Sequence, residues 1–493
     1  MKKLSAGITL LFASFNLLAT TAWAEAPKMQ MPTNPVGGKP PEGSSPSTKD
    51  FSYQLTYQRA FESVVWSIPA VAIYGFVKAT EKLGGKDNTV LAYSRPARAN
   101  AELLTANDVT PYIGGYTDLR NGPVVFEIPA ESEKASLYGQ IADHWQVTIA
   151  NVGPSGLDEG RGAKLLITPP DYEEKIPEGF IHVKSPSYRL SFGFRSIPGP
   201  RSSTEKAHEY AKSMKLYYLS ELPDPKPTQF IDPSEMRLET LPVYDETYFE
   251  DIHAIISVEK SNPRDKVMMG MLASIGIEKG KPFNPSPETK KAMRQAAIDA
   301  FHYMRGLFEK AEPEEYYWKD RQWRYSLYSD SNRGFSWEND EMIDIDRRAA
   351  RPYSWGTFFP NVMPERPATA YLHLVADEAG NLLQAGKTYS LRVPRDMPVE
   401  QFWSLIVYDF ETMAFIYNPM NRQGLNSIRD LGQMKKNSDG SITLYFGPKA
   451  PDGKEDNWIP TAGKRPMPIM RFYSPTDDFY DRTFKLPDVQ LLD

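Results

Sequence analysis

The chain has 493 residues, 42 prolines, no cysteine and a formal net charge of −6. The lack of cysteine excludes a disulfide framework and a lipid-modified N-terminal cysteine, and the acidic balance argues against a nucleic-acid partner, which needs a basic stripe. A chain of this length exceeds one ordinary hydrophobic core, so two or more domains are expected. The aromatic residues (9 Trp, 27 Tyr and 24 Phe) and the prolines favour short strands and turns over long helices.

Residues 1–24 have the pattern of a cleaved secretory signal peptide. Two lysines precede an apolar run from Leu4 to Leu18, and Ala22-Trp23-Ala24 forms a small-x-small cleavage site. A membrane anchor is the competing interpretation, but Ser, Gly and Asn interrupt the run, and no later segment approaches the length of a membrane span. We therefore expect a periplasmic or secreted protein of a Gram-negative cell, with no integral membrane segment once the signal is removed.

The mature chain is expected to open with a leader, a helix and a β domain. Residues 25–50 are rich in Pro, Gly and Ser with little to bury, which predicts a flexible leader. From Phe51 apolar residues recur at helical spacing until Pro69, where we expect the helical hydrogen-bond ladder to be interrupted, and Gly84-Gly85 marks the end of the helical region. Short apolar runs separated by turn residues then predict an antiparallel sandwich or barrel, so residues 51–235 form a β-rich N-terminal domain with a leading helix.

A helical connecting region, residues 236–345, is predicted before the C-terminal β domain, residues 346–493. Its clearest helix starts after Ser286, a good N-cap, and carries one apolar stripe. Alternating apolar and polar residues return in Tyr389–Val393 and in Ser441–Phe446. The predicted fold is mainly β with helical additions (α+β, multidomain): two antiparallel β-sandwich or jelly-roll-like domains joined by a helical insert.

Two sets of short strings carry a family resemblance. The N-terminal strings are Asn107-Asp108-Val109-Thr110-Pro111-Tyr112, Tyr116-Thr117-Asp118-Leu119-Arg120, Gly122-Pro123-Val124-Val125 and Phe194-Arg195-Ser196. The C-terminal strings are Phe402 to Asp409, Asn418, Asn421-Arg422, Asp439-Gly440-Ser441, Asn457 to Pro460 and Arg471-Phe472-Tyr473-Ser474-Pro475. With them the chain resembles exported bacterial proteins that pair two domains of unknown function, DUF1254 and then DUF1214. The resemblance implies two sandwich-like β domains in an envelope or secreted protein, and it implies no established reaction.

The loop that holds Asp108, Thr110 and Tyr112 is the first candidate ligand site. Asp108 can shape a turn by accepting backbone N–H bonds, and the proline at 111 holds Thr110 extended. Because Tyr112 and Asp118 follow closely, the alternative interpretation is the rim of a polar pocket, since loops on rigid sheets often carry sites. Both interpretations stay open.

Asp143 and His144 are the candidate catalytic pair, because a carboxylate beside an imidazole can set its tautomer and raise its basicity. Neighbouring residues of a strand point to opposite faces, so the pair can cooperate only across a bulge or turn. A buried, satisfied histidine is the competing interpretation. The other histidines are isolated in sequence, no metal-ligand spacing is present, and no cofactor is expected.

The C-terminal candidates are Asn418, Asn421, Arg422 and Trp458. Aromatic residues here, Tyr408 and Tyr473 among them, can form a stacking platform, with asparagines and arginines such as Arg471 as hydrogen-bond donors. The competing interpretation is that the rings fill the core and the polar groups satisfy turns. Arg422 is the residue to test first, because a loop guanidinium can clamp a carboxylate.

Two hypotheses about function follow. The first is an envelope protein that binds a polar small molecule, a glycan or a partner in a pocket at or between its two β domains. The second is a hydrolase or lyase that acts on a small molecule or glycan through Asp and His side chains. Paired carboxylates would favour the second, and an aromatic pocket without such a pair would favour the first. A homo-oligomer is compatible with either hypothesis.

Overall fold

The computed structural model describes residues 37–351 and 366–492, so the predicted signal peptide lies outside the described residues. Residues 37–50, the described part of the predicted leader, contain turns and bends. They belong to a unit that ends at Asp50, and Phe51 begins the second unit. All that follows concerns the second unit.

The N-terminal β region consists of two facing sheets, and most of their strand pairs are antiparallel. The larger sheet has the order β11-β1-β3-β9-β5-β6 and the smaller one β10-β4-β7-β8. The strands are β1 (Val90–Ala92), β3 (Tyr112–Asp118), β4 (Val124–Ile128), β5 (Ala135–Asp143), β6 (Thr148–Val152), β7 (Ala163–Thr168), β8 (Ile181–Lys184), β9 (Arg189–Pro198), β10 (Lys215–Tyr218) and β11 (Phe230–Ile231). Side chains of both sheets, such as Phe126 and Phe192, share one core, so this region is a sandwich. A short helix, α2 (Thr204–Ala211), packs against β9.

The C-terminal β region repeats this arrangement with its own core. A five-stranded sheet, β13-β14-β20-β16-β17, faces a four-stranded sheet, β19-β18-β15-β21. The strands are β13 (Arg324–Tyr325), β14 (Thr369–His373), β15 (Tyr389–Val393), β16 (Val399–Asp409), β17 (Gly424–Asn426), β18 (Ile442–Gly447), β19 (Trp458–Pro460), β20 (Pro466–Pro475) and β21 (Gln490–Leu491). The predicted fold class is therefore confirmed. A short helix, α7 (Asp477–Tyr480), follows β20.

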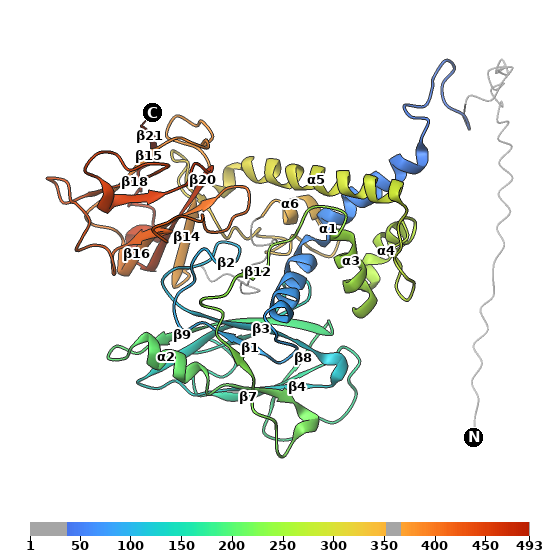
Figure 1. Ribbon diagram of the computed structural model, residues 1–493, viewed down its shortest axis with the longest axis horizontal. Coiled ribbons are helices and arrows are strands. Elements are labelled where there is room, and N and C mark those ends of the chain that lie inside the picture. The colour runs from blue at the N-terminus through green and yellow to red at the C-terminus, as the bar shows by residue number, and fades with distance from the viewer. Residues whose placement is uncertain (1–36, 352–365, 493) are drawn as a thin grey trace, which may run out of the picture. The chain divides into compact units, whose positions relative to one another are not determined.

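The remaining helices pack together beside the two large sheets (Figure 1). They are α1 (Phe51–Lys82), α3 (Tyr248–Val258), α4 (Lys266–Ala273), α5 (Pro287–Glu309) and α6 (Ile345–Ala349). Two short strands, β2 (Ala101–Glu102) and β12 (Leu238–Glu239), pair in parallel, and β12 contacts α1. The predicted helix after Ser286 is confirmed as α5, because the Ser286 side chain accepts from the N–H of Thr289. Residues of the predicted stripe, among them Met293 and Met304, are buried.

The helical region was expected to end at Gly84-Gly85, and α1 ends just before it, at Lys82. Pro69 has no N–H and so removes one bond from the ladder, as expected. The helix continues through it, although an interior proline costs about 3 kcal/mol or more, because most of its length is buried against α3 and α5. By length and composition α1 is also the one helix among residues 37–351 and 366–492 that qualifies as a membrane span, whereas no such segment was expected. However, 78% of its apolar window is buried inside the protein, as in the core helix of a globular domain.

Candidate functional site

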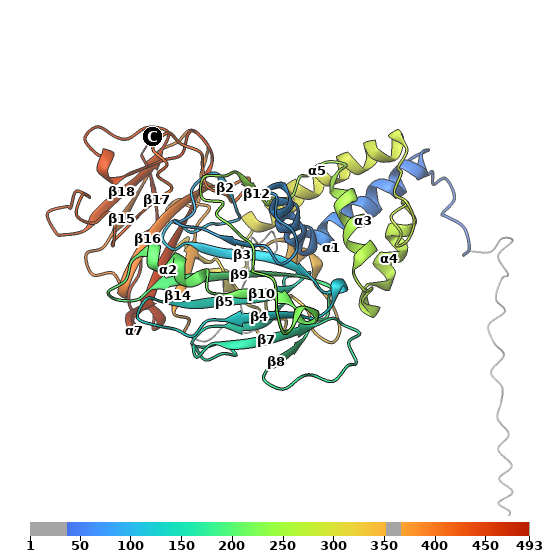
Figure 2. The same cartoon turned by 60° about the horizontal axis from the view of Figure 1, so that its bottom comes forward.

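A cavity of about 670 Å³ lies between the six-stranded and the five-stranded sheets. The views of Figures 1 and 2 show the two sheets, with β9 and β3 on one side and β14 and β16 on the other. Strands β1, β3, β5 and β9 supply one wall, strands β14, β16 and β20 the other, and the loop before β3 closes one side. Both β regions therefore contribute to one site.

On the N-terminal wall, strand register aligns Arg195 with two tyrosines. Arg195 of β9 lies opposite Tyr112 of β3 and opposite Tyr138 of β5, so the three side chains form one row on one face of the sheet. The Arg195 guanidinium carbon lies 3.7 Å from the centre of the Tyr112 ring. Its Nη1 donates to the carbonyl oxygen (2.9 Å) and to Oγ1 (2.8 Å) of Thr110. The stacked ring and the two bonds hold the guanidinium in a defined orientation in the cavity wall.

On the C-terminal wall, Arg471 of β20 lies opposite Tyr371 of β14. Its Nη2 donates to the carbonyl oxygen of Thr105 (3.1 Å) and to the hydroxyl of Tyr408 (2.6 Å). Its Nε and Nη1 are buried and have no hydrogen-bond partner among the described residues. Buried donors of this kind cost free energy unless a ligand or water satisfies them. Arg471 is therefore held in place with hydrogen-bonding capacity to spare.

The charge in the cavity wall is positive. The described residues that line it include two arginines and no Asp or Glu. Burial lowers the pKa of Arg471, but the phenols of Tyr408, Tyr473 and Tyr371 raise it by more, so the pKa lies above its ordinary value. Burial also lowers the pKa of Arg195, but the phenols of Tyr112 and three further tyrosines together outweigh it, so this pKa is raised as well. Both guanidiniums are charged at neutral pH.

Most of the remaining wall is apolar. The aromatic rings of Phe402 and Tyr473 are stacked with their centres 3.8 Å apart at one side of the cavity. Ile469 and Met467 also line the cavity and alternate with core-facing residues along β20, and Leu103 and Leu104 come from the loop before β3. An apolar cavity with a few oriented polar groups is the usual form of a small-molecule site.

The loop of residues 105–110 joins the two β regions at the cavity. The backbone N–H of Thr105 donates to Met413 O (2.7 Å), and Asn107 Nδ2 donates to the hydroxyl of Tyr473 (2.9 Å). The hydroxyl of Tyr408 donates to the carbonyl oxygen of Ala106. This loop is thus held by the C-terminal region while it lines the site.

Each of the two β regions contains a match to a known family of protein domains. A family model described as "Protein of unknown function (DUF1254)" matches residues 88–218, and one described as "Protein of unknown function (DUF1214)" matches residues 368–477. This chain pairs a DUF1254 domain with a DUF1214 domain, in that order. The predicted pairing is confirmed, and each domain supplies one of the two cavity arginines.

The chain is also similar to two solved structures. A crystal structure of the VPA0106 protein from Vibrio parahaemolyticus is 18% identical with a TM-score of 0.49, over 89% of this chain and 100% of that chain. A crystal structure of an uncharacterized protein from Burkholderia cenocepacia is 10% identical with a TM-score of 0.39, over 90% of this chain and 96% of that chain. No curated protein matches the sequence.

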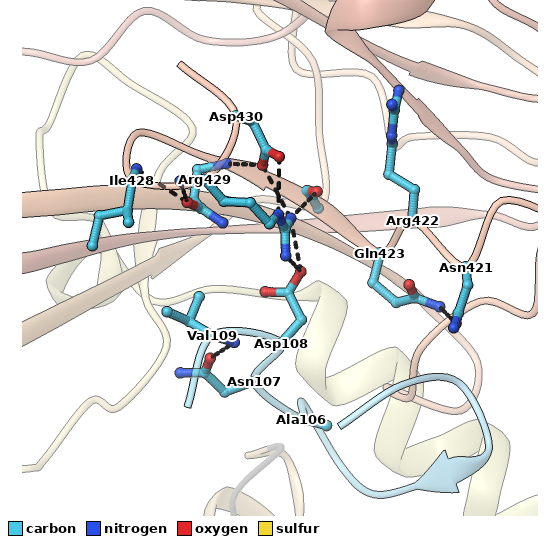
Figure 3. A network of polar contacts seen from close by, with 12 residues as sticks. Ala106, Asn107, Asp108, Val109, Asn421, Arg422, Gln423, Ile428, Arg429 and Asp430 are labelled. Carbon is cyan, nitrogen blue, oxygen red and sulfur yellow. Dashed lines mark hydrogen bonds and ion pairs between the residues drawn. The ribbon is translucent and has the colours of Figure 1, made fainter. Parts of the chain in front are cut away.

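Of the predicted residues in the DUF1254 domain, Thr110 and Tyr112 line the cavity, and Asp108 is next to it. Figure 3 shows Asp108 facing Arg429 of the DUF1214 domain, with Asp108 Oδ2 3.4 Å from Arg429 Nη2. Arg429 also pairs with Asp430. Burial raises the pKa of Asp108, and the charges of Arg429 and Arg471 oppose that rise. Asp108 therefore connects the two domains.

Asp118 lies at the far end of β3, outside the described cavity lining. Its carboxylate accepts from Arg120 and lies 3.5 Å from Arg189 Nε, its neighbour across the β3–β9 ladder. Burial raises the pKa of Asp118, but the bonds from Arg120 and the charge of Arg189 outweigh it, so the pKa is lowered.

The predicted catalytic pair occupies the turn that ends β5, also outside the described cavity lining. Asp143 Oδ1 accepts from the backbone N–H groups of Trp145 and Val147, both at 2.8 Å. The His144 ring nitrogens are buried and make no hydrogen bond within the described residues, so none links them to Asp143. Burial and the charge of Arg189 lower the pKa of His144 to about 3, and burial raises that of Asp143 to about 6. The imidazole is neutral at pH 7.

Of the predicted C-terminal residues, Asn418, Asn421 and Arg422 form a local turn and Trp458 begins β19; all four lie outside the described cavity lining. Asn418 Oδ1 accepts from the N–H of Arg422, and Arg422 Nη1 donates to the carbonyl oxygens of Glu455 and Trp458. Asn421 sits at a positive φ of 50°. In Figure 3 the Arg422 side chain points away from Asp108 and Arg429.

Of the two residues with the strongest chemical character, Arg195 was not predicted as a site residue, and Arg471 was considered only as a hydrogen-bond donor beside the aromatic platform. Both stand in the strings that carried the family resemblance, Phe194-Arg195-Ser196 and Arg471-Phe472-Tyr473. The sequence pattern that could have identified them is an arginine within a strand of otherwise apolar or aromatic residues. Such a pattern indicates a functional site, because a charged residue is rarely buried without a partner.

Proposed function

We propose that this protein binds a small organic acid in the cavity between its DUF1254 and DUF1214 domains. The observation that supports this most is the pair Arg195 and Arg471, two buried or half-buried guanidiniums in a wall whose described residues include no carboxylate. A carboxylate matches the planar fork of a guanidinium and satisfies its free N–H groups. The apolar remainder of the wall then suits the body of the ligand.

A calorimetric titration of the purified full chain tests the proposal. We expect benzoate and octanoate to bind, and the neutral probes benzamide and maltose to bind at least tenfold more weakly, because a hydrogen bond to a charged group is worth about 1.5–3 kcal/mol. Maltose also tests the glycan alternative. Equal binding of acids and neutral probes, or binding of maltose alone, would contradict the proposal.

Arg471→Lys and Arg471→Met locate the interaction. Both should weaken benzoate binding, the methionine variant more. Arg422→Met is the matched control, because Arg422 is a hydrogen-bonded arginine of the same domain outside the described cavity lining. Circular dichroism and a melting curve show whether each variant folds. An Arg422→Met variant that loses affinity as strongly as Arg471→Met would move the site elsewhere.

The second hypothesis, a hydrolase or lyase that uses Asp143 and His144, has less support. The described cavity lining lacks the paired carboxylates on which glycoside hydrolysis depends, and the pair lies outside it. Turnover of an ester or glycoside that is lost in His144→Phe would restore this hypothesis.

We further propose that binding takes place outside the cytoplasm. The support is the sequence of residues 1–24, with Lys2 and Lys3, the apolar run and Ala22-Trp23-Ala24. N-terminal sequencing of protein from a periplasmic extract should read from Glu25. An intact Met1 on protein that fractionates with the cytoplasm would refute export.

Size-exclusion chromatography with light scattering tests whether the protein is a homo-oligomer.

A further inference from the structure

We infer, resting on the proposed function, that the ligand is an aromatic carboxylic acid with a hydroxyl group across the ring from its carboxylate, and that His373 recognises that hydroxyl. His373 does not belong to the arginine pair that carries the proposed function. It adds a second polar point to the same cavity.

His373 is a fixed polar group in the wall. It lies on β14 of the DUF1214 domain, lines the cavity and is 4% exposed. Its ring is stacked on Phe308, with the centres 5.0 Å apart, and its Nδ1 lies 3.3 Å from Ser326 Oγ. These two contacts determine where the other ring nitrogen, Nε2, lies.

The second ring nitrogen is left without a hydrogen bond. His373 Nε2 is buried and has no hydrogen-bond partner among the described residues. A buried polar atom without a partner costs free energy that a ligand can recover. We therefore infer that Nε2 forms a hydrogen bond with a group on the molecule that fills the cavity.

A hydroxyl group on the ligand suits a neutral imidazole. Burial, together with the charges of Arg324 and Arg351, lowers the pKa of His373 well below its ordinary value. The neutral ring carries either an N–H or a lone pair at Nε2, depending on its tautomer. A hydroxyl satisfies both cases, because it donates and accepts.

The spacing between the two polar points suits a ring. Arg471 lies opposite Tyr371 and His373 lies opposite Ile469, so Arg471 and His373 are diagonal neighbours on adjacent strands. Such neighbours are about 7–8 Å apart between their Cα atoms. The surface between them is aromatic and apolar, which favours a flat apolar spacer over a polar chain.

The wild-type protein alone can test this inference. 4-Hydroxybenzoate and 4-methylbenzoate have nearly the same shape, and only the first can bond to Nε2. We expect 4-hydroxybenzoate to bind about tenfold more tightly in calorimetry, the worth of one buried hydrogen bond. Equal affinities, or tighter binding of the methyl compound, would overturn the inference.

His373→Phe should remove this preference and leave the affinity for 4-methylbenzoate within about threefold of wild type. His253→Phe is the matched control, since His253 is also stacked on a phenylalanine, Phe283, and also hydrogen-bonded, but lies outside the described cavity lining. A preference that survives in His373→Phe would show that another residue reads the hydroxyl. If the variant does not fold, the wild-type comparison still decides.

Two further probes separate this inference from the proposed function. 4-Hydroxycyclohexanecarboxylate has both polar groups on a saturated ring, and we expect it to bind at least fivefold more weakly than 4-hydroxybenzoate. If octanoate binds in an Arg471-dependent manner while the aromatic acids bind no better, the aromatic ligand class is wrong and the proposed function stands. If no acid binds at all, the proposed function fails as well.

Discussion

Arg195 lies directly opposite Tyr112 across the β3–β9 ladder, with its guanidinium carbon 3.7 Å from the centre of the Tyr112 ring. The two residues are far apart in the chain, and the register between two strands brings them together in the cavity wall. This contact orients a cation that the DUF1254 domain presents to the DUF1214 domain.

Arg195→Lys should weaken benzoate binding about tenfold although it keeps the charge. A lysine ammonium cannot stack flat on Tyr112, bond to Thr110 through one nitrogen and offer a planar fork to the ligand with the others. Calorimetry measures the affinity. Arg189→Lys, on the same strand but outside the described cavity lining, serves as the control. A lysine variant that binds like wild type would mean that charge alone is sufficient.

Gly114→Val should fill part of the cavity. Within 4 Å, a Cβ at Gly114 meets only the carbonyl oxygen of Phe192, at 3.1 Å, and a valine suits a strand. Because this contact is tight and the neighbouring strand must shift by a few tenths of an ångström, we expect a loss of benzoate affinity of at least tenfold together with a lower melting temperature. Gly432→Val is the control, because Gly432 has open space around it and lies outside the described cavity lining. Unchanged affinity in Gly114→Val would place the ligand elsewhere.

The Asp108–Arg429 ion pair should contribute little to stability. The Asp108 side chain is only 10% exposed, but that of Arg429 is 48% exposed, the N–O separation is 3.4 Å, and Arg429 also pairs with Asp430. A double-mutant cycle with Asp108→Asn and Arg429→Gln, measured by urea denaturation, should give a coupling of about 0.2–1 kcal/mol. Asp108→Asn should change benzoate affinity by less than threefold, since Asp108 is not among the described lining residues. A coupling above about 3 kcal/mol would mean that the pair is effectively desolvated.

Glu259 should make the protein less stable as pH rises. Burial raises its pKa from 4.5 to about 7, while its oxygens accept from the N–H groups of Tyr188 and Arg189. Because the folded pKa lies above the unfolded one, the stability that this group contributes is fully present below about pH 4.5 and is lost as pH rises through 7. Between pH 5 and pH 8 the free energy of unfolding of wild type should therefore fall relative to that of Glu259→Gln, by on the order of 3 kcal/mol.

Urea denaturation at several pH values between 5 and 8 measures this change. Glu127→Gln is the opposite control. Burial raises the pKa of Glu127, but bonds from Tyr217, Lys215 and Lys164 outweigh it and lower the pKa to about 2. Its contribution is thus constant above pH 5, and the variant should differ from wild type by the same amount throughout. A parallel pH profile for Glu259→Gln and wild type would show that Glu259 is ionised in the folded protein.

Local features of the chain were predictable because their causes are local. The cap at Ser286, the apolar stripe of α5 and the alternation of β15 and β18 follow from the period of a helix or a strand. The end of the helical region near Gly84-Gly85 was predictable for the same reason. That α1 continues as one helix through Pro69 was not, because the free energy of burying the helix outweighs the local cost of the proline. A local rule fails where burial in the core outweighs it.

The cavity depends on contacts that no local pattern specifies. Residue types and periods in the sequence determine that there are two β domains and a helical region, and short strings identify the family. That Arg195, Arg471 and His373 line one space depends on the register of β3, β9, β14 and β20 and on the packing of one sheet against another. Register and sheet packing are set by interactions between distant segments, so the site became visible only when the chain was folded.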